Sequence, residues 1–300
     1  MYRMYYDAEL INLPVVHIGK VREVYLFKND LLIVASDRIS AFDCVIPTII
    51  PDKGKILHKL SMFWFDLVKD IVPNHIITGN FDEFPDELKK YEYLRDRSML
   101  VKKAERVDIE CIVRGYLAGS GWKEYQKSKT VCGIVLPDGL KESSKLPEPV
   151  FTPSSKEEGG KHDENISFEE TVKRAGEETA ESLKELSLAL YKKASEYSLS
   201  KGIILSDTKL EFGFHNGKLI LIDEIFTPDS SRFWEVGKYS EGKPQDSLDK
   251  QYVRDYLEYI EWDKTPPAPT LPKKVVEKTM KKYTNAYEKL TGKKLMINGK

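Results

Sequence analysis

The segment from Leu205 to Trp234 carries more ionisable side chains than a β-hairpin with only a structural role needs. Asp207, Lys209 and Glu211 alternate along its first arm, so a strand would place them on one face. The returning arm, 219–222, is apolar on both faces, which predicts burial on both sides. Buried charges need partners, and a metal ion would supply one. An acidic hairpin that faces water is the alternative.

The turn at residues 215–217 decides whether carboxylates of the two arms meet. A two-residue Asn216-Gly217 turn pairs Glu211 with Ile222, whereas a three-residue loop pairs Glu211 with Asp223. Like charges directly opposite each other cost roughly 0.2–1 kcal/mol unless a cation neutralises them. Mg²⁺ favours one or two carboxylates together with substrate phosphate oxygens. We therefore predict the three-residue loop, with Glu211 and Asp223 at a metal site.

Composition excludes several classes of protein. The 300 residues suggest two domains or one large one. Because 47 basic residues oppose 48 acidic ones, the net charge of −1 gives no global field for nucleic acid or anionic membranes. No apolar stretch is as long as a membrane span, and the N-terminus lacks a signal-peptide pattern. The three cysteines and five histidines lack metal-ligand spacing. These features predict a soluble cytoplasmic protein with no nucleic-acid or membrane partner.

Strand patterns come first along the chain and helical patterns later. Residues 21–27 and 31–35 read as two strands, and 56–71 has a helical period that stops before Pro73. From 137 to 166 the composition shifts to Pro, Ser, Gly and charge, as in a linker or a substrate lid. This order favours an α+β fold over a doubly wound sheet. Further strands are expected at 99–103 and 109–114, and further helices after the Ser167 capping box, near 249–260 and before Gly292.

Three clusters suit anions. Gly19-Lys20-Val21-Arg22 starts a hairpin where glycine lets backbone N–H groups approach phosphate, although a surface hairpin would look the same. Arg114 ends a buried strand before a small-residue turn with Ser120, which suits a phosphate monoester or a salt-bridged strand end. Arg232 follows the acidic hairpin. With a carboxylate pair for a hard cation, these clusters favour phosphoryl transfer.

Two polar loops have open roles. Residues 36–43 mix charges and hydroxyls, which fits a zwitterionic ligand or a turn with a local ion pair. Residues 152–156, followed by 162–165, are too polar for a core, so a linker and a substrate lid are the rivals. There is no G-x-S-x-G motif, and no cysteine has an obvious histidine partner, which argues against a nucleophilic triad.

Six motifs in this order resemble the family of phosphoribosylaminoimidazole-succinocarboxamide synthases, or SAICAR synthetases, of purine synthesis. They are G-K-V-R-E-V-Y (19–25), S-D-R-I-S-A-F-D (36–43), R-G-Y-L-A-G-S (114–120), F-T-P-S-S-K with H-D-E-N-I-S (151–167), L-S-D-T-K-L-E-F-G (205–213) and D-E-I-F-T-P-D-S-S-R-F-W (223–234). The middle insertion and C-terminal extension resemble the larger, yeast-like branch. Asp108 departs from the proline of many relatives, which affects only a turn.

The resemblance implies an α+β, SAICAR synthetase-like fold with an ATP site between two domains. Residues 1–104 would form an antiparallel-sheet domain, and 105–300 a larger α+β domain with a lid-like insertion at 137–166 and C-terminal helices. It also implies an ATP-dependent ligase that uses Mg²⁺. This enzyme condenses carboxyaminoimidazole ribonucleotide (CAIR) with L-aspartate through an acyl phosphate and gives SAICAR, ADP and phosphate.

Each implied role falls on particular residues. Gly19, Lys20, Val21 and Arg22 would lie over the ATP phosphates, with Lys102 on the adenine side. Arg114, Ser120 and Arg232 would hold the CAIR phosphate, and Asp207 and Lys209 its imidazole and carboxylate. Glu211 and Asp223 would bind Mg²⁺ and complete the catalytic set with Asp207 and Lys209. Candidates for the aspartate pocket are Asp37, Arg38, Ser40, Lys156, Asp163, Glu164 and Asn165.

Two rival functions use the same parts. A small-molecule kinase would transfer phosphate to a hydroxyl and release ADP without aspartate. A nucleotide-binding regulatory module would bind Mg-ATP without turnover. Both a monomer and a homodimer are compatible with the sequence.

Overall fold

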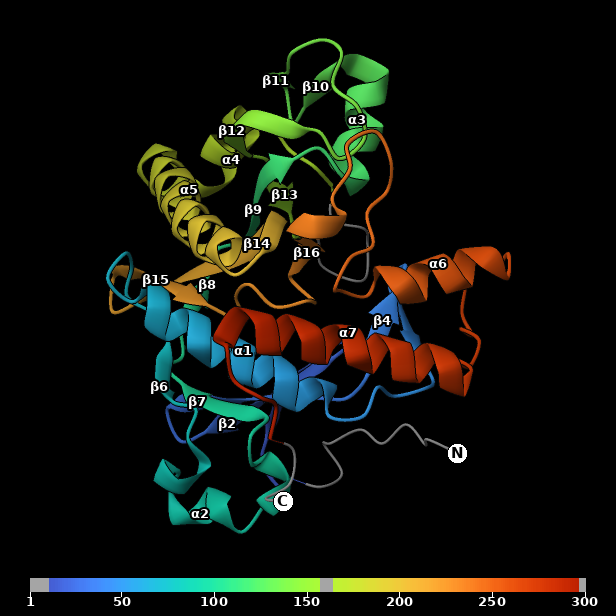
Figure 1. The fold of residues 1–300 in the computed structure, drawn as a ribbon. Coiled ribbons are helices and arrows are strands. Elements are labelled where there is room, and N and C mark those ends of the chain that lie inside the picture. The colour runs from blue at the N-terminus through green and yellow to red at the C-terminus, as the bar shows by residue number, and fades with distance from the viewer. Residues whose placement is uncertain (1–10, 157–163, 297–300) are drawn as a thin grey trace.

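The computed structural model describes residues 11–156 and 164–296, which form two main antiparallel sheets with helices between and around them (Figure 1). The first sheet has the strand order β1-β2-β3-β7-β6, and its strands are β1 (Val15–Ile18), β2 (Arg22–Phe27), β3 (Asp30–Ala35), β6 (Ile76–Thr78) and β7 (Ser98–Val101). This arrangement confirms the predicted hairpin of 21–27 and 31–35, and the two sheets with their helices confirm the predicted α+β class.

The second sheet has the path β12-β9-β14-β15, with β8, β13 and β16 paired at its margins. Its strands are β8 (Glu105–Arg106), β9 (Ile109–Tyr116), β12 (Lys145–Phe151), β13 (Ser154–Ser155), β14 (Ile203–His215), β15 (Lys218–Ile222) and β16 (Ser231–Glu235). Two short hairpins pair β4 (Ile39–Ala41) with β5 (Cys44–Ile46) and β10 (Thr130–Val131) with β11 (Ile134–Val135). The chain leaves the first sheet after Val101 and enters the second at Glu105.

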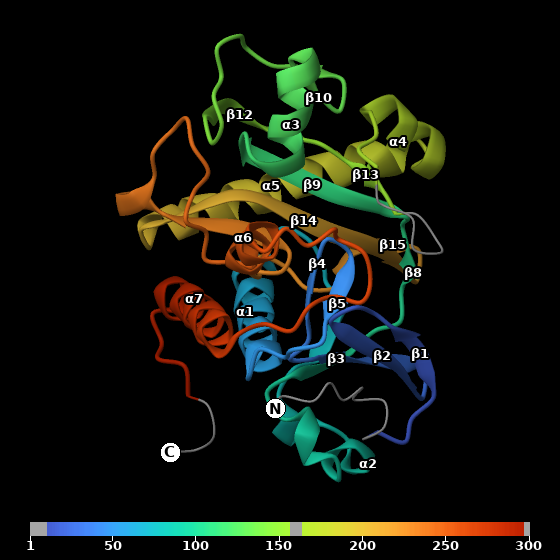
Figure 2. The ribbon, with the colours of Figure 1, turned by 90° about the vertical axis from the view of Figure 1, so that its right-hand side faces the viewer.

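Helices pack on both faces of the second sheet (Figure 2). The helices are α1 (Lys53–Val68), α2 (Asp86–Lys89), α3 (Gly119–Ser128), α4 (Phe168–Ala175), α5 (Glu177–Ser200), α6 (Gln251–Tyr259) and α7 (Lys273–Thr291). α1 and α7 run side by side between the two sheets, and α5 covers the other face of the second sheet. The largest core therefore joins Trp64 of α1, Leu190 of α5, Phe212 of β14 and Tyr283 of α7.

The helix predicted over 56–71 is α1, and it begins three residues earlier than its apolar period suggests. Asp52 precedes it without a side-chain cap. Instead, the Asp37 carboxylate accepts hydrogen bonds from the backbone N–H groups of Asp52 (3.2 Å) and Gly54 (2.9 Å). A carboxylate at this position satisfies N–H groups that have no partner within the helix. The cap comes from a distant residue, so a local pattern cannot reveal it.

The three-residue loop predicted at 215–217 is wrong. His215 pairs with Lys218, so Asn216 and Gly217 form a two-residue turn, and Glu211 lies opposite Ile222 rather than Asp223. Both turn residues have positive φ, 51° and 73°. Asn-Gly is the dipeptide that best tolerates this conformation, and the resulting twist matches that of the flanking strands. The turn chemistry thus outweighs the argument from opposed carboxylates.

Replacing Gly217 by alanine is expected to lower the free energy of unfolding by about 1 kcal/mol, because alanine disfavours positive φ. No other group lies within 4 Å of an added Cβ, so strain alone would act. Urea unfolding measures this loss. Gly237→Ala is the control, because that glycine is also open to a Cβ but has an ordinary φ. Equal losses in the two variants would contradict the explanation.

Residues 137–166 contain more regular structure than predicted. β12 and β13 both pair with β9, so part of this polar stretch belongs to the second sheet. The helical region after Ser167 is broken at Gly176, where φ is 84°, into α4 and α5. Ser167 caps α4 through the N–H of Glu170, as predicted.

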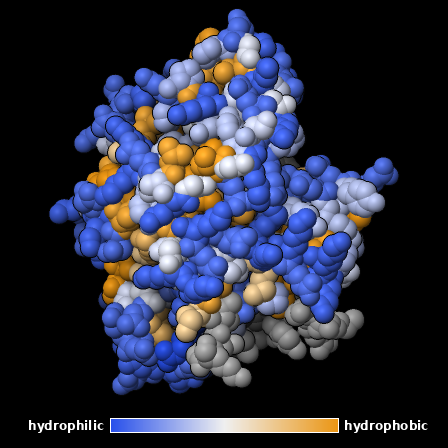
Figure 3. Space-filling model, in the orientation of Figure 1, coloured by the Kyte–Doolittle hydropathy of each residue, from blue (hydrophilic) through white to orange (hydrophobic). Residues whose placement is uncertain are grey.

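The surface in the view of Figure 3 is largely hydrophilic, with smaller apolar patches. Within the described ranges, no helix combines the length and apolarity needed to cross a membrane. Cys44, Cys111 and Cys132 are free thiols.

Candidate active site

The centre of the candidate site is a carboxylate shared by two arginines. Asp207 on β14 lies opposite Arg114 of β9 and Arg232 of β16 in the register of the sheet. One carboxylate oxygen of Asp207 contacts both guanidinium groups, that of Arg114 at 3.2 Å. The Asp207 carboxylate raises the pKa of Arg232, whereas burial lowers the pKa of Arg114. Guanidinium groups suit carboxylate and phosphate oxygens, so the two arginines that share Asp207 are a candidate site for a doubly charged anion.

Two hydroxyls hold the Arg114 guanidinium group in this candidate anion site. Arg114 donates to Ser120 Oγ and to Thr152 Oγ1, each at 3.0 Å. Ser120 lies in the first turn of α3, where free backbone N–H groups also favour anions. The preceding Gly119 has φ of 57°, and an added Cβ would stand 2.5 Å from a terminal nitrogen of Arg232. Only glycine permits this approach. The predicted phosphate-binding residues Arg114, Ser120 and Arg232 therefore lie together.

Two ion pairs continue along the same face of β14. Lys209 contacts Glu110 of β9, and Glu211 contacts Lys156, which follows β13. Asp207 and Glu211 are 6% and 17% exposed, and Lys209 is 49% exposed. The predicted alternation of charged and apolar faces on β14 is confirmed.

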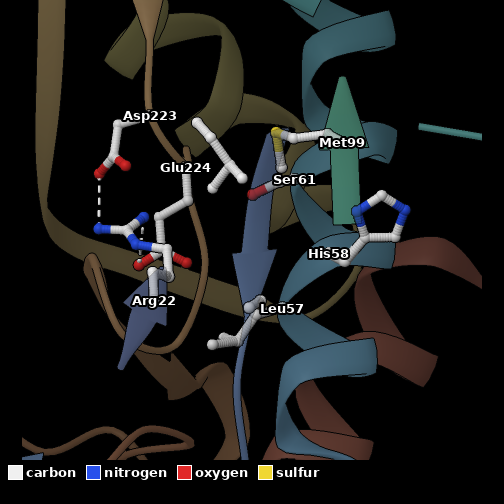
Figure 4. Close-up of a pocket in the computed structure, with 9 residues that line it drawn as sticks. Arg22, Leu57, His58, Ser61, Met99, Asp223 and Glu224 are labelled. Carbon is white, nitrogen blue, oxygen red and sulfur yellow. Dashed lines mark ion pairs between the residues drawn. The ribbon is translucent and has the colours of Figure 1, made fainter. Parts of the chain in front are cut away.

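The two sheets meet beside this face, where Arg22 bridges them (Figure 4). Its guanidinium lies 2.7 Å from Asp223 and 3.2 Å from Glu224, which follow β15. Burial opposes its charge, but the carboxylates of Asp223, Glu224 and Glu211 outweigh burial and raise the pKa of Arg22. Arg22 thus neutralises acids for which we had predicted a metal ion as the partner.

Hydrogen bonds and ion pairs fix the turn that precedes Arg22. Gly19 N–H donates to the Arg22 carbonyl at 2.8 Å, and Lys20 contacts Asp43. The buried Arg38 donates to the carbonyls of Lys20 (3.1 Å) and Gly19 (3.3 Å) and pairs with Glu23 at 2.6 Å. A buried ion pair therefore fixes the loop from Gly19 to Val21.

The residues proposed for an aspartate pocket do not form one cluster. Asp37 caps α1 and pairs with Arg97, and Arg38 is only 1% exposed beneath the turn, so both have structural partners. Asn165 donates to Glu124 at 2.8 Å. The remaining candidates are Ser40 on β4, Lys156 beside Glu211 and Glu164, whose carbonyl accepts from Ser155; Asp163 lies outside the described residues.

Lys102 follows the end of β7, close to the junction of the sheets. Its N–H donates to the His75 carbonyl at 2.8 Å, and His75 N–H donates to Leu221 of β15 at 3.1 Å. This short path connects the first sheet to the acidic loop after β15.

Glu211 and Asp223 could hold a hard cation such as Mg²⁺ together with the phosphate oxygens of a bound ligand. Within 11–156 and 164–296, no group of three or more His, Cys, Asp or Glu side chains is placed to hold a metal ion. Mg²⁺ commonly takes one or two carboxylates and completes its shell with phosphate oxygens and water. Glu211 and Asp223, both close enough to Arg22 to raise its pKa, fit this pattern.

Several contact residues escaped the sequence prediction. Glu110, Thr152 and Glu224 contact Lys209, Arg114 and Arg22 respectively. Glu110 could have been predicted from the sequence, because it is an acid within an apolar strand and lies on the same side as Ile112 and Arg114. The contact of Thr152 could not, because the sequence of a loop does not distinguish a threonine that has an arginine partner from one that does not.

A small cavity behind Arg22 contains His58 and Ser61 of α1 (Figure 4). His58 Nε2 lies 3.0 Å from the Gly79 carbonyl, while burial lowers the pKa of His58 to about 4. Between pH 6.5 and pH 4, His58 is therefore protonated in the unfolded chain but neutral in the folded chain. Stability is therefore expected to fall as the pH drops from 6.5 towards 4, by about 1.4 kcal/mol per pH unit for this histidine.

Urea unfolding at several pH values measures this slope. Burial also lowers the pKa of His75, to about 3, so His58→Gln should reduce the slope without abolishing it. His17→Gln, at an exposed position, should leave the slope unchanged. An unchanged slope in His58→Gln would refute the assignment.

Comparison with known proteins decides the family. The family model described as SAICAR synthetase matches residues 15–269. The chain belongs to the SAICAR synthetase family. It is 61% identical over 286 residues to the phosphoribosylaminoimidazole-succinocarboxamide synthase of Thermodesulfovibrio yellowstonii, covering 95% of this chain and 98% of that one. The chain is thus a ligase of purine biosynthesis with SAICAR synthetase activity.

Solved structures of the SAICAR synthetase family confirm the fold and the branch. The SAICAR synthase of Saccharomyces cerevisiae in complex with SAICAR has a TM-score of 0.88 and 43% identity, covering 99% of this chain and all (100%) of that one. A Type-2 SAICAR synthetase structure in complex with ADP has a TM-score of 0.69 and 26% identity, covering 94% and 100%. The higher score for the yeast enzyme agrees with the predicted larger branch.

Proposed function

We propose that the chain joins CAIR to L-aspartate at the expense of ATP, through an acyl phosphate, on the charged face of β14. The observation that carries this proposal is the pair of arginines that share Asp207 beside the acidic junction at Arg22. One part suits the phosphate of a ribonucleotide, and the other suits a nucleoside triphosphate with its cation. A ligase that activates a carboxylate with ATP needs both.

The CAIR phosphate would lie against Arg114, Arg232 and Ser120. Asp207 would keep the two arginines apart and oriented in the absence of substrate, and would accept a hydrogen bond from the imidazole substituents. Lys209, next along the face and half exposed, would meet the CAIR carboxylate. The relative solved with SAICAR supports a site for this class of ligand.

ATP would bind across the junction of the sheets. Backbone groups of Gly19, Lys20 and Val21, with the side chains of Lys20 and Arg22, would contact its phosphates, and Lys102 would line the adenine side. The relative solved with ADP supports the use of ATP. Mg²⁺ would be held by Glu211 and Asp223, and it would neutralise charge on the phosphate oxygens.

The chemistry explains the need for phosphate. An amine does not displace oxide from a carboxylate at a useful rate, so a CAIR carboxylate oxygen first attacks the γ-phosphorus and ADP leaves. The aspartate amine then attacks the acyl carbon, loses a proton, and expels phosphate that retains the carboxylate oxygen. Arg22 and Lys209 would place positive charge where the transferred group and the carboxylate meet.

For L-aspartate we propose Lys156 as the first contact, because its ammonium group lies beside Glu211 on the same face. Ser40, Glu164 and Asn165 stay as further candidates. Both a monomer and a homodimer are compatible with this proposal. We further propose a cytoplasmic location and no nucleic-acid or membrane partner.

ADP release with CAIR and L-aspartate supplied singly and together tests the proposal. Rapid release is expected only when both are present. Rapid release with CAIR alone, together with a stable phosphorylated product, would favour a kinase. Binding of Mg-ATP without turnover under any condition would favour a regulatory module.

A further inference from the structure

Helix α7 (Lys273–Thr291) lies beyond residues 15–269, which the family model matches, yet it reaches the loop of the candidate site. It packs along α1 (Figure 1), and most of its buried residues are apolar or aromatic. Tyr283 is the buried residue of α7 whose polar group contacts the loop of the candidate site. This fully buried side chain donates a hydrogen bond of 2.7 Å to Asp229 Oδ1.

Asp229 is bound on both carboxylate oxygens. Its second oxygen lies 2.6 Å from the ammonium group of Lys53, at the start of α1. The side chains of Lys53 and Asp229 are 0% and 5% exposed. Burial opposes charge on Asp229, but Lys53, Lys250 and the hydrogen bond from Tyr283 together outweigh burial and lower the pKa of that carboxyl to about 2. A lysine at a helix N-terminus opposes the helix dipole, so Asp229 is the partner that Lys53 requires.

Hydrogen bonds connect the loop around Asp229 to both parts of the candidate site. Asp229 N–H donates to Thr227 Oγ1 at 3.2 Å, and the same hydroxyl donates to Glu224 at 2.9 Å. Ser231 N–H donates to the Thr227 carbonyl at 2.8 Å, immediately before Arg232. One hydrogen-bonded loop therefore connects Asp223 and Glu224, which pair with Arg22, to Arg232, which pairs with Asp207.

We propose that Tyr283 and Lys53 are positioning residues that hold this loop through Asp229, and so set the spacing between the Asp223–Glu224 acids and Arg232. The inference rests on the roles proposed above for Asp223 and Arg232. It gives α7 a function in substrate binding besides packing. Removing the hydroxyl of Tyr283 would free one oxygen of Asp229 and let the loop shift while the apolar contacts of the ring remain.

Tyr283→Phe tests the proposal, with Tyr287→Phe as the matched control on the same helix. Tyr287 is also buried in the core around α1, α5 and α7, but the hydrogen bond to Asp229 Oδ1 comes from Tyr283. Titration calorimetry with CAIR reports two separate quantities, the Kd of the folded protein and the number of sites per chain. We expect the Kd and the KM for CAIR to rise about 5- to 10-fold in Tyr283→Phe, with unchanged stoichiometry. Tyr287→Phe should leave both constants unchanged.

The opposite results overturn the proposal in distinguishable ways. A lower stoichiometry or a lower melting temperature with an unchanged Kd would show that Tyr283 has a structural role only. No CAIR binding by the unaltered chain would sink the proposed function as well. If Tyr283→Phe does not fold, Asp229→Glu keeps the charge beside Lys53 but moves the loop, and an unchanged Kd in that variant would refute the inference.

Discussion

Replacing Glu211 by glutamine is expected to lower kcat at least about 100-fold at saturating ATP, CAIR and aspartate, because charge neutralisation by a metal ion is worth several kcal/mol. Glutamine has the same shape and can still accept a hydrogen bond from Lys156, so the fold should persist. The loss would come from the missing negative charge on the cation site. Steady-state ADP release across a range of Mg²⁺ concentrations measures kcat and the Mg²⁺ dependence together.

Two further observations make this test specific. Binding of Mn²⁺ in the presence of ADP, followed by calorimetry, should weaken in Glu211→Gln independently of turnover. Glu105→Gln, on β8 at the margin of the same sheet and exposed, should behave like the unaltered chain. A near-normal rate of Glu211→Gln at saturating Mg²⁺ would refute the metal role.

Replacing Arg114 by lysine is expected to raise the KM for CAIR about 100-fold while leaving the KM for ATP nearly unchanged. Lysine keeps the charge but cannot reach Ser120, Thr152 and Asp207 together, as the guanidinium does. Because the site is buried, the groups left without a partner add to the loss. Initial rates with each substrate varied in turn separate the two KM values.

Arg106→Lys is the control for this substitution. Arg106 lies on β8, its side chain is 42% exposed, and it pairs with Asp108. Such an exposed pair contributes little, so both KM values should stay within about twofold of the unaltered chain. If Arg114→Lys also leaves the KM for CAIR unchanged, the phosphate of CAIR binds elsewhere.

Local patterns predicted the elements that build the site. Alternation along 205–213 placed Asp207, Lys209 and Glu211 on one face of β14, and that arrangement is present. The helical period of 56–71 located α1 to within a few residues. These signals are local, because periodicity and turn residues act within a few positions of the chain.

The partners of charged residues could not be predicted in the same way. Asp37 and Arg38 looked like ligand-binding residues, but they cap α1 and support the Gly19 turn. A sequence shows a charge without showing its counter-charge, which can lie far along the chain: Lys53 and Asp229 are separated by 176 positions. In the same way, the sequence did not reveal that Arg22 lies beside Asp223, one of the two carboxylates proposed to hold Mg²⁺.

The turn at Asn216-Gly217 shows how two physical effects compete. Repulsion between opposed carboxylates, and its relief by a cation, argued for one register, and the conformational preference of Asn-Gly argued for the other. The second effect won, since both residues take positive φ. Asp223 then leaves the strand with φ of 66° and meets Arg22 from the loop, so the acids gather around the arginine without facing each other in the sheet.

The central claim is that this charged junction activates the CAIR carboxylate as an acyl phosphate before aspartate attacks. The most direct test supplies CAIR with ¹⁸O in both carboxylate oxygens, together with unlabelled ATP and L-aspartate, and analyses the inorganic phosphate by mass spectrometry. The proposed chemistry predicts one ¹⁸O atom in each phosphate released. Phosphate without ¹⁸O, formed at the same rate as SAICAR, would contradict it.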